Sequence, residues 1–159
     1  MSEGVQPAHH IGDDQIRATS NEAPVPHFER TAFTQPRALP AATMAIVTTA
    51  GLHHPEDAGF QLGEQTFRVL DSERRDLVLG HTSANFDRSG FLDDLNVVFP
   101  IDRLAELRAN GAIGAIAPRH LSFMGALDET MSSIRLDSVP AAARLLKSDG
   151  VDVVILTPV

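Results

Sequence analysis

The chain of 159 residues contains no cysteine, tryptophan or tyrosine, and phenylalanine is its only aromatic residue type. Without cysteine, these residues form no disulfide and no thiolate metal site, and they hold no cysteine nucleophile. Acidic residues outnumber basic ones, and the formal net charge is −8. Nucleic-acid binding uses basic side chains against phosphates and aromatic side chains against bases, so this composition disfavours a nucleic-acid partner.

Long apolar segments are also absent. No run approaches the roughly 20 apolar residues that cross a bilayer, and the N-terminal sequence MSEGVQPAHH lacks the basic start and apolar core of a secretion signal. We therefore expect a cytoplasmic protein that does not enter a membrane. What is present, 43% hydrophobic and 21% charged residues, is typical of a globular protein.

Residues 1–42 are polar, contain several prolines and show no sustained helical or strand periodicity. We expect them to form an N-terminal arm, extended or partly disordered, with Val25, Phe28 and Phe33 as its anchors on a neighbouring surface. Residues 43–159 fit one further domain, since domains cluster at roughly 100–150 residues.

Short apolar runs bounded by glycine, proline or polar residues predict the strands of this domain. The clearest are 44–49 (MAIVTT) and 151–157 (VDVVILT), and the other candidates are 66–70, 77–79 and 112–117.

Two helices are predicted between the later strands. One begins after Pro100 and ends at Gly111, and the other has Ser138 as its N-terminal cap and ends at Gly150. Alternating strands and helices with short connections imply right-handed crossovers. We therefore expect an α/β fold, a parallel sheet with flanking helices of flavodoxin-like or Rossmann-like type, and an incomplete one.

Two adjacent histidines, His53 and His54, follow the first predicted strand. The ordinary interpretation is a pair of partly exposed loop histidines, because no metal-binding spacing accompanies them. However, ligands of open α/β sheets gather at the carboxyl ends of strands. We therefore predict that both histidines line a pocket and that neither binds a metal.

Two later segments supply the remaining candidates. Segment 80–87 (GHTSANFD) is rich in polar side chains, and a simple turn is the alternative to a binding loop because Ser, Asn and Asp favour turns. Arg119 and His120 follow the strand expected at 112–117. A guanidinium suits a substrate carboxylate, although a surface arginine is an equally good interpretation. The predicted substrate-binding residues are His53, His54, His81, Asp87, Arg119 and His120, with no metal ligand and no nucleotide-binding glycine motif.

Five segments carry a resemblance to a known family. They are GLHHPED from Gly51, HTSANFD from His81, DDLNVVFPIDRL from Asp93, GAIGAIAPRHLSFMG from Gly111 and ARLLKSDGVDVVILTPV from Ala143. In this order they resemble the selenoprotein B family of the glycine, sarcosine, betaine and D-proline reductases. The resemblance extends from Thr43 to Val159.

This resemblance implies reductive cleavage in amino-acid metabolism. Members of the family are similar in placing a selenocysteine, or a cysteine, in a redox motif just after the strand that corresponds to residues 151–157. That residue attacks the substrate or an activated adduct, and thiols elsewhere regenerate it. The family thus implies a small amino acid or betaine-like substrate, a dithiol electron donor, other reductase subunits including a carbonyl-activating one, and an oligomeric assembly.

The sequence stops at Val159, before the position of that redox residue. A strand as apolar as 151–157 also needs cover on both faces and pairing on its edges. We therefore expect selenocysteine or cysteine immediately after Val159 in the full-length product, and no catalytic residue in the chain as given. The preferred explanation is an in-frame UGA translated as a stop, and the other is a short subunit that a second chain completes. The competing functional hypothesis is a non-catalytic, flavodoxin-like subunit for small-molecule binding or assembly.

Overall fold

The computed structural model describes residues 34–83, 86–125, 127 and 131–159, together with Gln15, Ala18, Glu22 and Glu29. The chain divides into two units, Met1–Phe33 and Thr34–Val159. The proposed anchors of the arm, Val25, Phe28 and Phe33, lie outside the described residues. All helices and strands with assigned bounds belong to the second unit.

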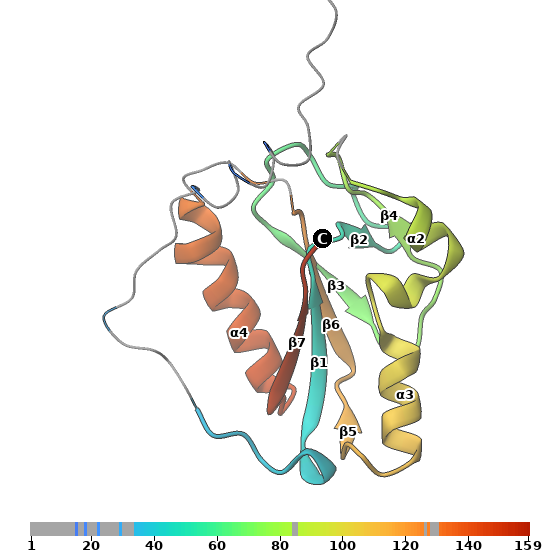
Figure 1. Cartoon of the computed structure of the whole chain (residues 1–159). Helices are drawn as coiled ribbons and strands as arrows, with labels where there is room; N and C mark the ends of the chain where they lie inside the picture. The colour runs from blue at the N-terminus through green and yellow to red at the C-terminus, as the bar shows by residue number, and fades with distance from the viewer. Residues whose placement is uncertain are drawn as a thin grey trace, which may run out of the picture. The chain divides into compact units, whose positions relative to one another are not determined.

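The second unit is built on a five-stranded sheet centred on β1 (Thr43–Thr48), as Figure 1 shows. On one edge of β1 lies β7 (Val153–Thr157), which is parallel to it. On the other edge lie β5 (Ala115–Ile116) and then β6 (Arg119–Phe123), both also parallel to β1. The outermost strand is β3 (Phe67–Asp71), which is antiparallel to β6. The sheet is therefore mixed but mostly parallel.

The predicted α/β class is confirmed. The strands expected at 44–49 and 151–157 are β1 and β7. The strand expected at 66–70 is β3, whose antiparallel direction differs from the all-parallel expectation.

Two other strand predictions are only partly confirmed. The strand expected at 77–79 is β4 (Val78–Leu79), which pairs with β2 (Leu52–His53) in a separate two-stranded antiparallel sheet. Of residues 112–117, only β5 is a strand. Arg119 and His120 were expected to follow the strand at 112–117, but they belong to a further strand, β6, which the sequence did not predict.

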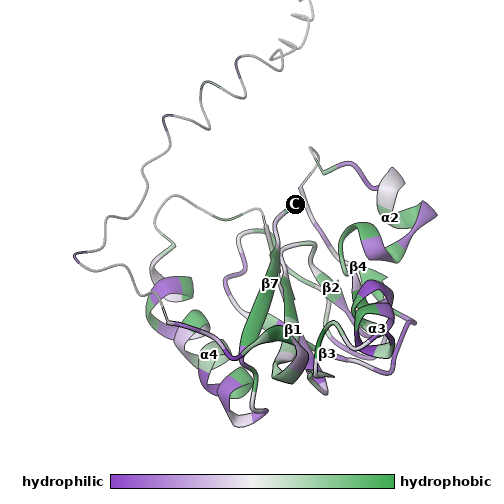
Figure 2. Ribbon diagram, turned by 60° about the horizontal axis from the view of Figure 1, so that its bottom comes forward, coloured by the Kyte–Doolittle hydropathy of each residue, from purple (hydrophilic) through white to green (hydrophobic). Residues whose placement is uncertain are grey.

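Helices cover both faces of the sheet (Figure 2). On one face, α3 (Ile101–Ala109) packs with Leu104 against a cluster that includes Ile46 and Phe99. On the other face, α4 (Val139–Ser148) packs with Leu146 against a second cluster. Its other buried members are Ala45, Ala117, Leu121, Phe123 and Ala142. Alternate residues of β1 thus enter opposite clusters, as strand geometry requires.

Both helices agree with the sequence in position, and one predicted cap is wrong. Gly111 follows α3 with φ +77, the left-handed conformation that ends helices and that glycine adopts without strain. Ser138, however, belongs to a π-helical turn, η3 (Ile134–Ser138), which leads directly into α4. Its backbone is helical and its side chain makes no capping hydrogen bond, since the helix has already begun before it.

The shorter elements connect these parts. They are η1 (Leu39–Ala41), α2 (Ser89–Asp93) and η2 (Leu95–Val97). Within the described part of the chain, every helix is too short or too polar to cross a membrane.

Candidate functional site

The six predicted binding residues do not converge on one pocket. His54 and Arg119 line the same hollow, on the β3 side of the sheet, whereas His81 lies where β1, β6 and β7 end. His120 is enclosed in the core, and His53 and Asp87 are engaged in local contacts.

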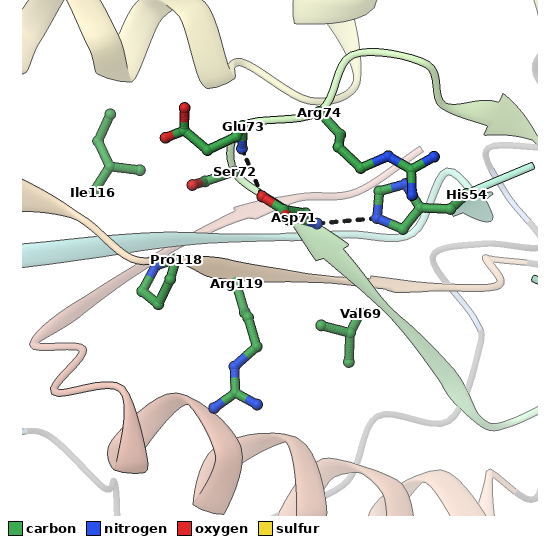
Figure 3. Close-up of a pocket in the computed structure, with 9 residues that line it drawn as sticks. All are labelled: His54, Val69, Asp71, Ser72, Glu73, Arg74, Ile116, Pro118 and Arg119. Carbon is green, nitrogen blue, oxygen red and sulfur yellow. Dashed lines mark hydrogen bonds between the residues drawn. The ribbon is translucent and has the colours of Figure 1, made fainter.

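The hollow on the β3 side, shown in Figure 3, has a volume of about 580 Å³. Its lining consists of His54, Val69, Asp71, Ser72, Glu73, Arg74, Ile116, Pro118 and Arg119. The backbone N–H of Asp71 donates to Nε2 of His54 at 3.1 Å, so the imidazole proton lies on Nδ1. That Nδ1 is buried and has no hydrogen-bond partner in the structure.

Arg119 is already paired within this chain. Its Nε and Nη2 donate to the two carboxylate oxygens of Asp149 at 2.9 and 2.5 Å, and Figure 3 shows its side chain directed away from His54. Hydrogen bonding to Arg119 lowers the pKa of Asp149 below its ordinary value. The guanidinium edge that a substrate carboxylate would occupy therefore fastens β6 to the end of α4 instead.

We expect Arg119→Gln to lower the free energy of unfolding only slightly, because the Arg119 side chain is 40% exposed and water screens the pair. A double-mutant cycle with Asp149→Asn, followed by urea unfolding, measures the coupling. Arg103→Gln is the matched control, since Arg103 and Glu106 form a more exposed pair one helical turn apart. A coupling energy of zero between Arg119 and Asp149 would contradict the fastening role.

His120 belongs to the core rather than to a pocket. It is fully buried, and its Nδ1 accepts a hydrogen bond from the backbone N–H of Ile46 at 3.0 Å. Its ring meets that of Phe99 edge-on, with centroids 5.3 Å apart. Burial lowers the pKa of His120 to about 4. The side chain is thus a neutral acceptor that joins β6 to β1.

His53 and Asp87 have local partners. His53 Nδ1 lies 2.7 Å from the backbone oxygen of His54 and therefore donates to it. Asp87 accepts from the backbone N–H and the hydroxyl of Ser89 at 2.9 and 2.7 Å, and these bonds lower its pKa. Asp87 therefore fills the turn role that was the alternative to a binding role. Among the described residues, no group of three His, Asp or Glu side chains could hold a metal ion.

A second hollow, of about 410 Å³, lies at the carboxyl ends of the parallel strands β1, β6 and β7. We call it the carboxyl-end site. Its mainly apolar lining consists of Val47, Thr49, Phe123, Met124, Gly125, Leu127, Ile134, Val139, Pro158 and Val159. The Thr49 hydroxyl accepts from the backbone N–H of Val159 at 2.9 Å, which ties the end of β7 to that of β1.

Gly125 lines the carboxyl-end site at a close approach of several backbone segments. A Cβ added there would lie 2.8 Å from the backbone oxygen of Val159, 3.1 Å from that of Thr49 and 3.0 Å from Nε2 of His81. Three polar atoms from three segments thus surround one position that only glycine can occupy. The sequence offered one signal for it, a glycine after an apolar residue pair, and that signal is equally typical of an ordinary turn.

His81 is buried beside Gly125. Only 6% of it is exposed, and its ring stacks on that of Phe86 with centroids 4.4 Å apart. Nδ1 accepts from the backbone N–H of Ser83 at 3.3 Å, which places the proton on Nε2. Burial, and secondarily the charge of Arg88, lowers the pKa of His81. His81 therefore presents a neutral imidazole whose buried Nε2–H has no acceptor in the structure.

Comparison with known proteins agrees with the resemblance noted in the sequence. Residues 16–159 match the family described as glycine/sarcosine/betaine reductase selenoprotein B. The D-proline reductase subunit gamma of Acetoanaerobium sticklandii is 37% identical over 118 residues, which are 72% of this chain and 48% of that protein. The chain therefore spans about half the length of this relative. No solved structure matches the chain.

Proposed function

The chain belongs to the glycine/sarcosine/betaine reductase selenoprotein B family, and we propose that it is the N-terminal portion of a selenocysteine- or cysteine-dependent reductase. The substrate is a small amino acid or a betaine-like molecule, which is cleaved reductively with a dithiol as electron donor. Because the chain contains no cysteine, the redox residue is supplied from outside these 159 residues. We place it directly after β7, in the full-length product.

The observation that carries this proposal is the carboxyl-end site. Parallel strands β1, β6 and β7 end there together, and ligands of open α/β sheets bind outside such strand ends. The lining is apolar with few polar groups, which is the usual composition of a small-molecule site. A redox residue after β7 would enter this site beside His81 and Gly125.

We further propose that the protein acts together with other reductase subunits. The name of the relative, D-proline reductase subunit gamma, describes that protein as one subunit of an enzyme. A carbonyl-activating subunit would supply the activated adduct that the redox residue attacks. The residues that bind substrate in this chain are then those of the carboxyl-end site. Of the six predicted binding residues, His81 is the one that lies beside it, next to Gly125.

Expression of the full reading frame, with any in-frame UGA decoded as selenocysteine, tests the function. We expect dithiothreitol-dependent reduction of glycine, sarcosine, betaine or D-proline when the partner subunits are added. Alanine in place of the redox residue should abolish turnover, because no cysteine in the 159 residues can replace it. Arg103→Gln, on the exposed face of α3, serves as a control that retains turnover.

Two outcomes would count against the proposal. One is a full-length protein with neither selenocysteine nor cysteine after β7. The other is a complete protein that binds one of these molecules but reduces none of them, which would favour a non-catalytic binding or assembly subunit.

A further inference from the structure

His81 has a buried hydrogen-bond donor without an acceptor, at the place where the proposed chemistry occurs. We propose that the Nε2–H of His81 donates a hydrogen bond to the selenolate or thiolate of the redox residue and thereby holds that residue in its reactive anionic form. This inference rests on the proposed function, and it assigns to a residue of this chain a direct contact with the reacting atom.

The tautomer follows from the contacts of the ring. The backbone N–H of Ser83 donates to Nδ1 at 3.3 Å, so Nδ1 is the acceptor and Nε2 carries the proton. If both ring nitrogens were protonated, Nδ1–H would lie opposite the backbone N–H of Ser83, and two donors would face each other without an acceptor. The ring is therefore a donor through Nε2 alone.

Gly125 shows how close that donor lies to the end of the segment that follows β7. The position that a Cβ of Gly125 would occupy lies 3.0 Å from Nε2 of His81 and 2.8 Å from the backbone oxygen of Val159. Nε2 of His81 and the backbone oxygen of Val159 thus both lie about 3 Å from one common point. A residue that follows Val159 would therefore lie next to the His81 ring.

A buried N–H without an acceptor is unusual, because its desolvation is not compensated. The structure nevertheless keeps the ring in place. Phe86 stacks on one face of it, and Arg88 donates to the backbone oxygen of His81 at 2.8 Å. A site for an anion needs hydrogen-bond donors that are already in position. The Nε2–H of His81 is such a donor, and an anion would supply the acceptor that it lacks.

A neutral imidazole can fill this role. It donates a hydrogen bond to an anion without transferring a proton to it, so the chalcogen remains a nucleophile. Burial and the nearby Arg88 both favour the neutral form. A hydrogen bond to a charged acceptor is also about twice as strong as one between neutral groups.

The test compares two variants of the full-length protein. His81→Phe keeps a ring against Phe86 but removes the donor, and His81→Gln keeps an N–H near the position of Nε2. The rate of alkylation of the redox residue by iodoacetamide, measured against pH, gives its pKa. We expect His81→Phe to raise that pKa by about one unit, which is a roughly tenfold loss of anion below the pKa, and His81→Gln to remain within about threefold of wild type.

A measurement on wild-type protein provides a second test if His81→Phe does not fold. In protein labelled with ¹⁵N-histidine, the Nε2–H resonance of His81 should shift at the pH at which the redox residue ionises. The inference would be overturned if the His81 Nε2–H resonance did not shift at this pH. It would also be overturned if His81→Phe left the pH dependence of alkylation unchanged.

Failure of the inference and failure of the proposed function give different results. If wild-type protein reduces substrate and only the effect of His81 is missing, the function stands without this contact. If wild-type protein has no alkylatable redox residue, the proposed function is wrong, and the role of His81 is wrong with it.

Discussion

Acidification from pH 6.5 to 4 should remove about 3 kcal/mol from the free energy of unfolding through His120 alone, because its pKa is lowered from 6.5 to about 4 in the fold and each pH unit is worth about 1.4 kcal/mol. The main cause is burial, to which the charge of Arg75 adds and which Asp71 partly opposes. The ring accepts from Ile46 N–H through Nδ1, and protonation would remove that acceptor.

The direction of the effect follows from where the proton binds. Between pH 6.5 and 4, His120 takes up a proton in the unfolded chain but not in the folded one, so each step toward acid favours unfolding. The contribution of neutral His120 to the free energy of unfolding is complete above about pH 6.5 and is lost by about pH 4. Other groups titrate as well, and the pKa of His81 is lowered in the same direction.

Urea unfolding at several pH values measures this dependence, and His120→Asn isolates the part that belongs to His120. Asparagine offers an oxygen near the position of Nδ1, so it can accept from Ile46 N–H, but it does not titrate. We expect the variant to be less stable at neutral pH, since it loses the contact with Phe99, and to lose less stability on acidification. Equal acid sensitivity of the two proteins would contradict a neutral, buried His120.

The elements that the sequence predicted well are those whose signal is local. β1 and β7 are apolar, β-branched runs of the kind found in parallel strands. β1 is largely buried, whereas Val154 and Leu156 on one face of β7 are exposed. α3 ends before Gly111 because that residue adopts a positive φ. In each case the determining residues lie within or directly beside the element.

The elements that the sequence did not predict depend on partners that are distant along the chain. β6 contains Arg119 and His120, which were expected to follow a strand and not to form one. Their partners, Asp149 and the backbone of Ile46, lie 30 and 74 residues away in sequence. The antiparallel direction of β3 likewise results from its pairing with β6, and nothing in its own residues specifies it.

The candidate site was predicted in the same uneven way. Its location at strand carboxyl ends could be predicted, because it follows from chain order in an α/β fold. Which of the predicted histidines lies beside it could not, since His53 and His54 also follow a strand. Their side chains instead contact the backbone of His54 and of Asp71.

Replacement of Gly125 by alanine should destabilise the chain by about 1–3 kcal/mol and displace the end of β7, because the new Cβ has no room. The atoms that it would meet at 2.8 and 3.1 Å are backbone oxygens of Val159 and Thr49, which cannot rotate away as a flexible side chain can. The third, Nε2 of His81 at 3.0 Å, belongs to a ring stacked on Phe86. Relief therefore requires movement of the strand ends.

Gly59→Ala is the matched control for this substitution. A Cβ at Gly59 meets only Nε2 of His53, at 3.8 Å, which is an ordinary contact. We expect this variant to equal or slightly exceed wild type in stability, by up to about 1 kcal/mol, since alanine restricts the unfolded chain.

Urea unfolding compares the two variants, and the ¹⁵N resonance of His81 Nε2 reports on the site. If Gly125→Ala and Gly59→Ala had equal unfolding midpoints, and the His81 resonance did not shift in Gly125→Ala, the strand ends would not approach Gly125 as closely as the structure indicates. If instead only Gly125→Ala lowers the midpoint and shifts that resonance, the same close approach that excludes a side chain at Gly125 also fixes His81 against the end of β7.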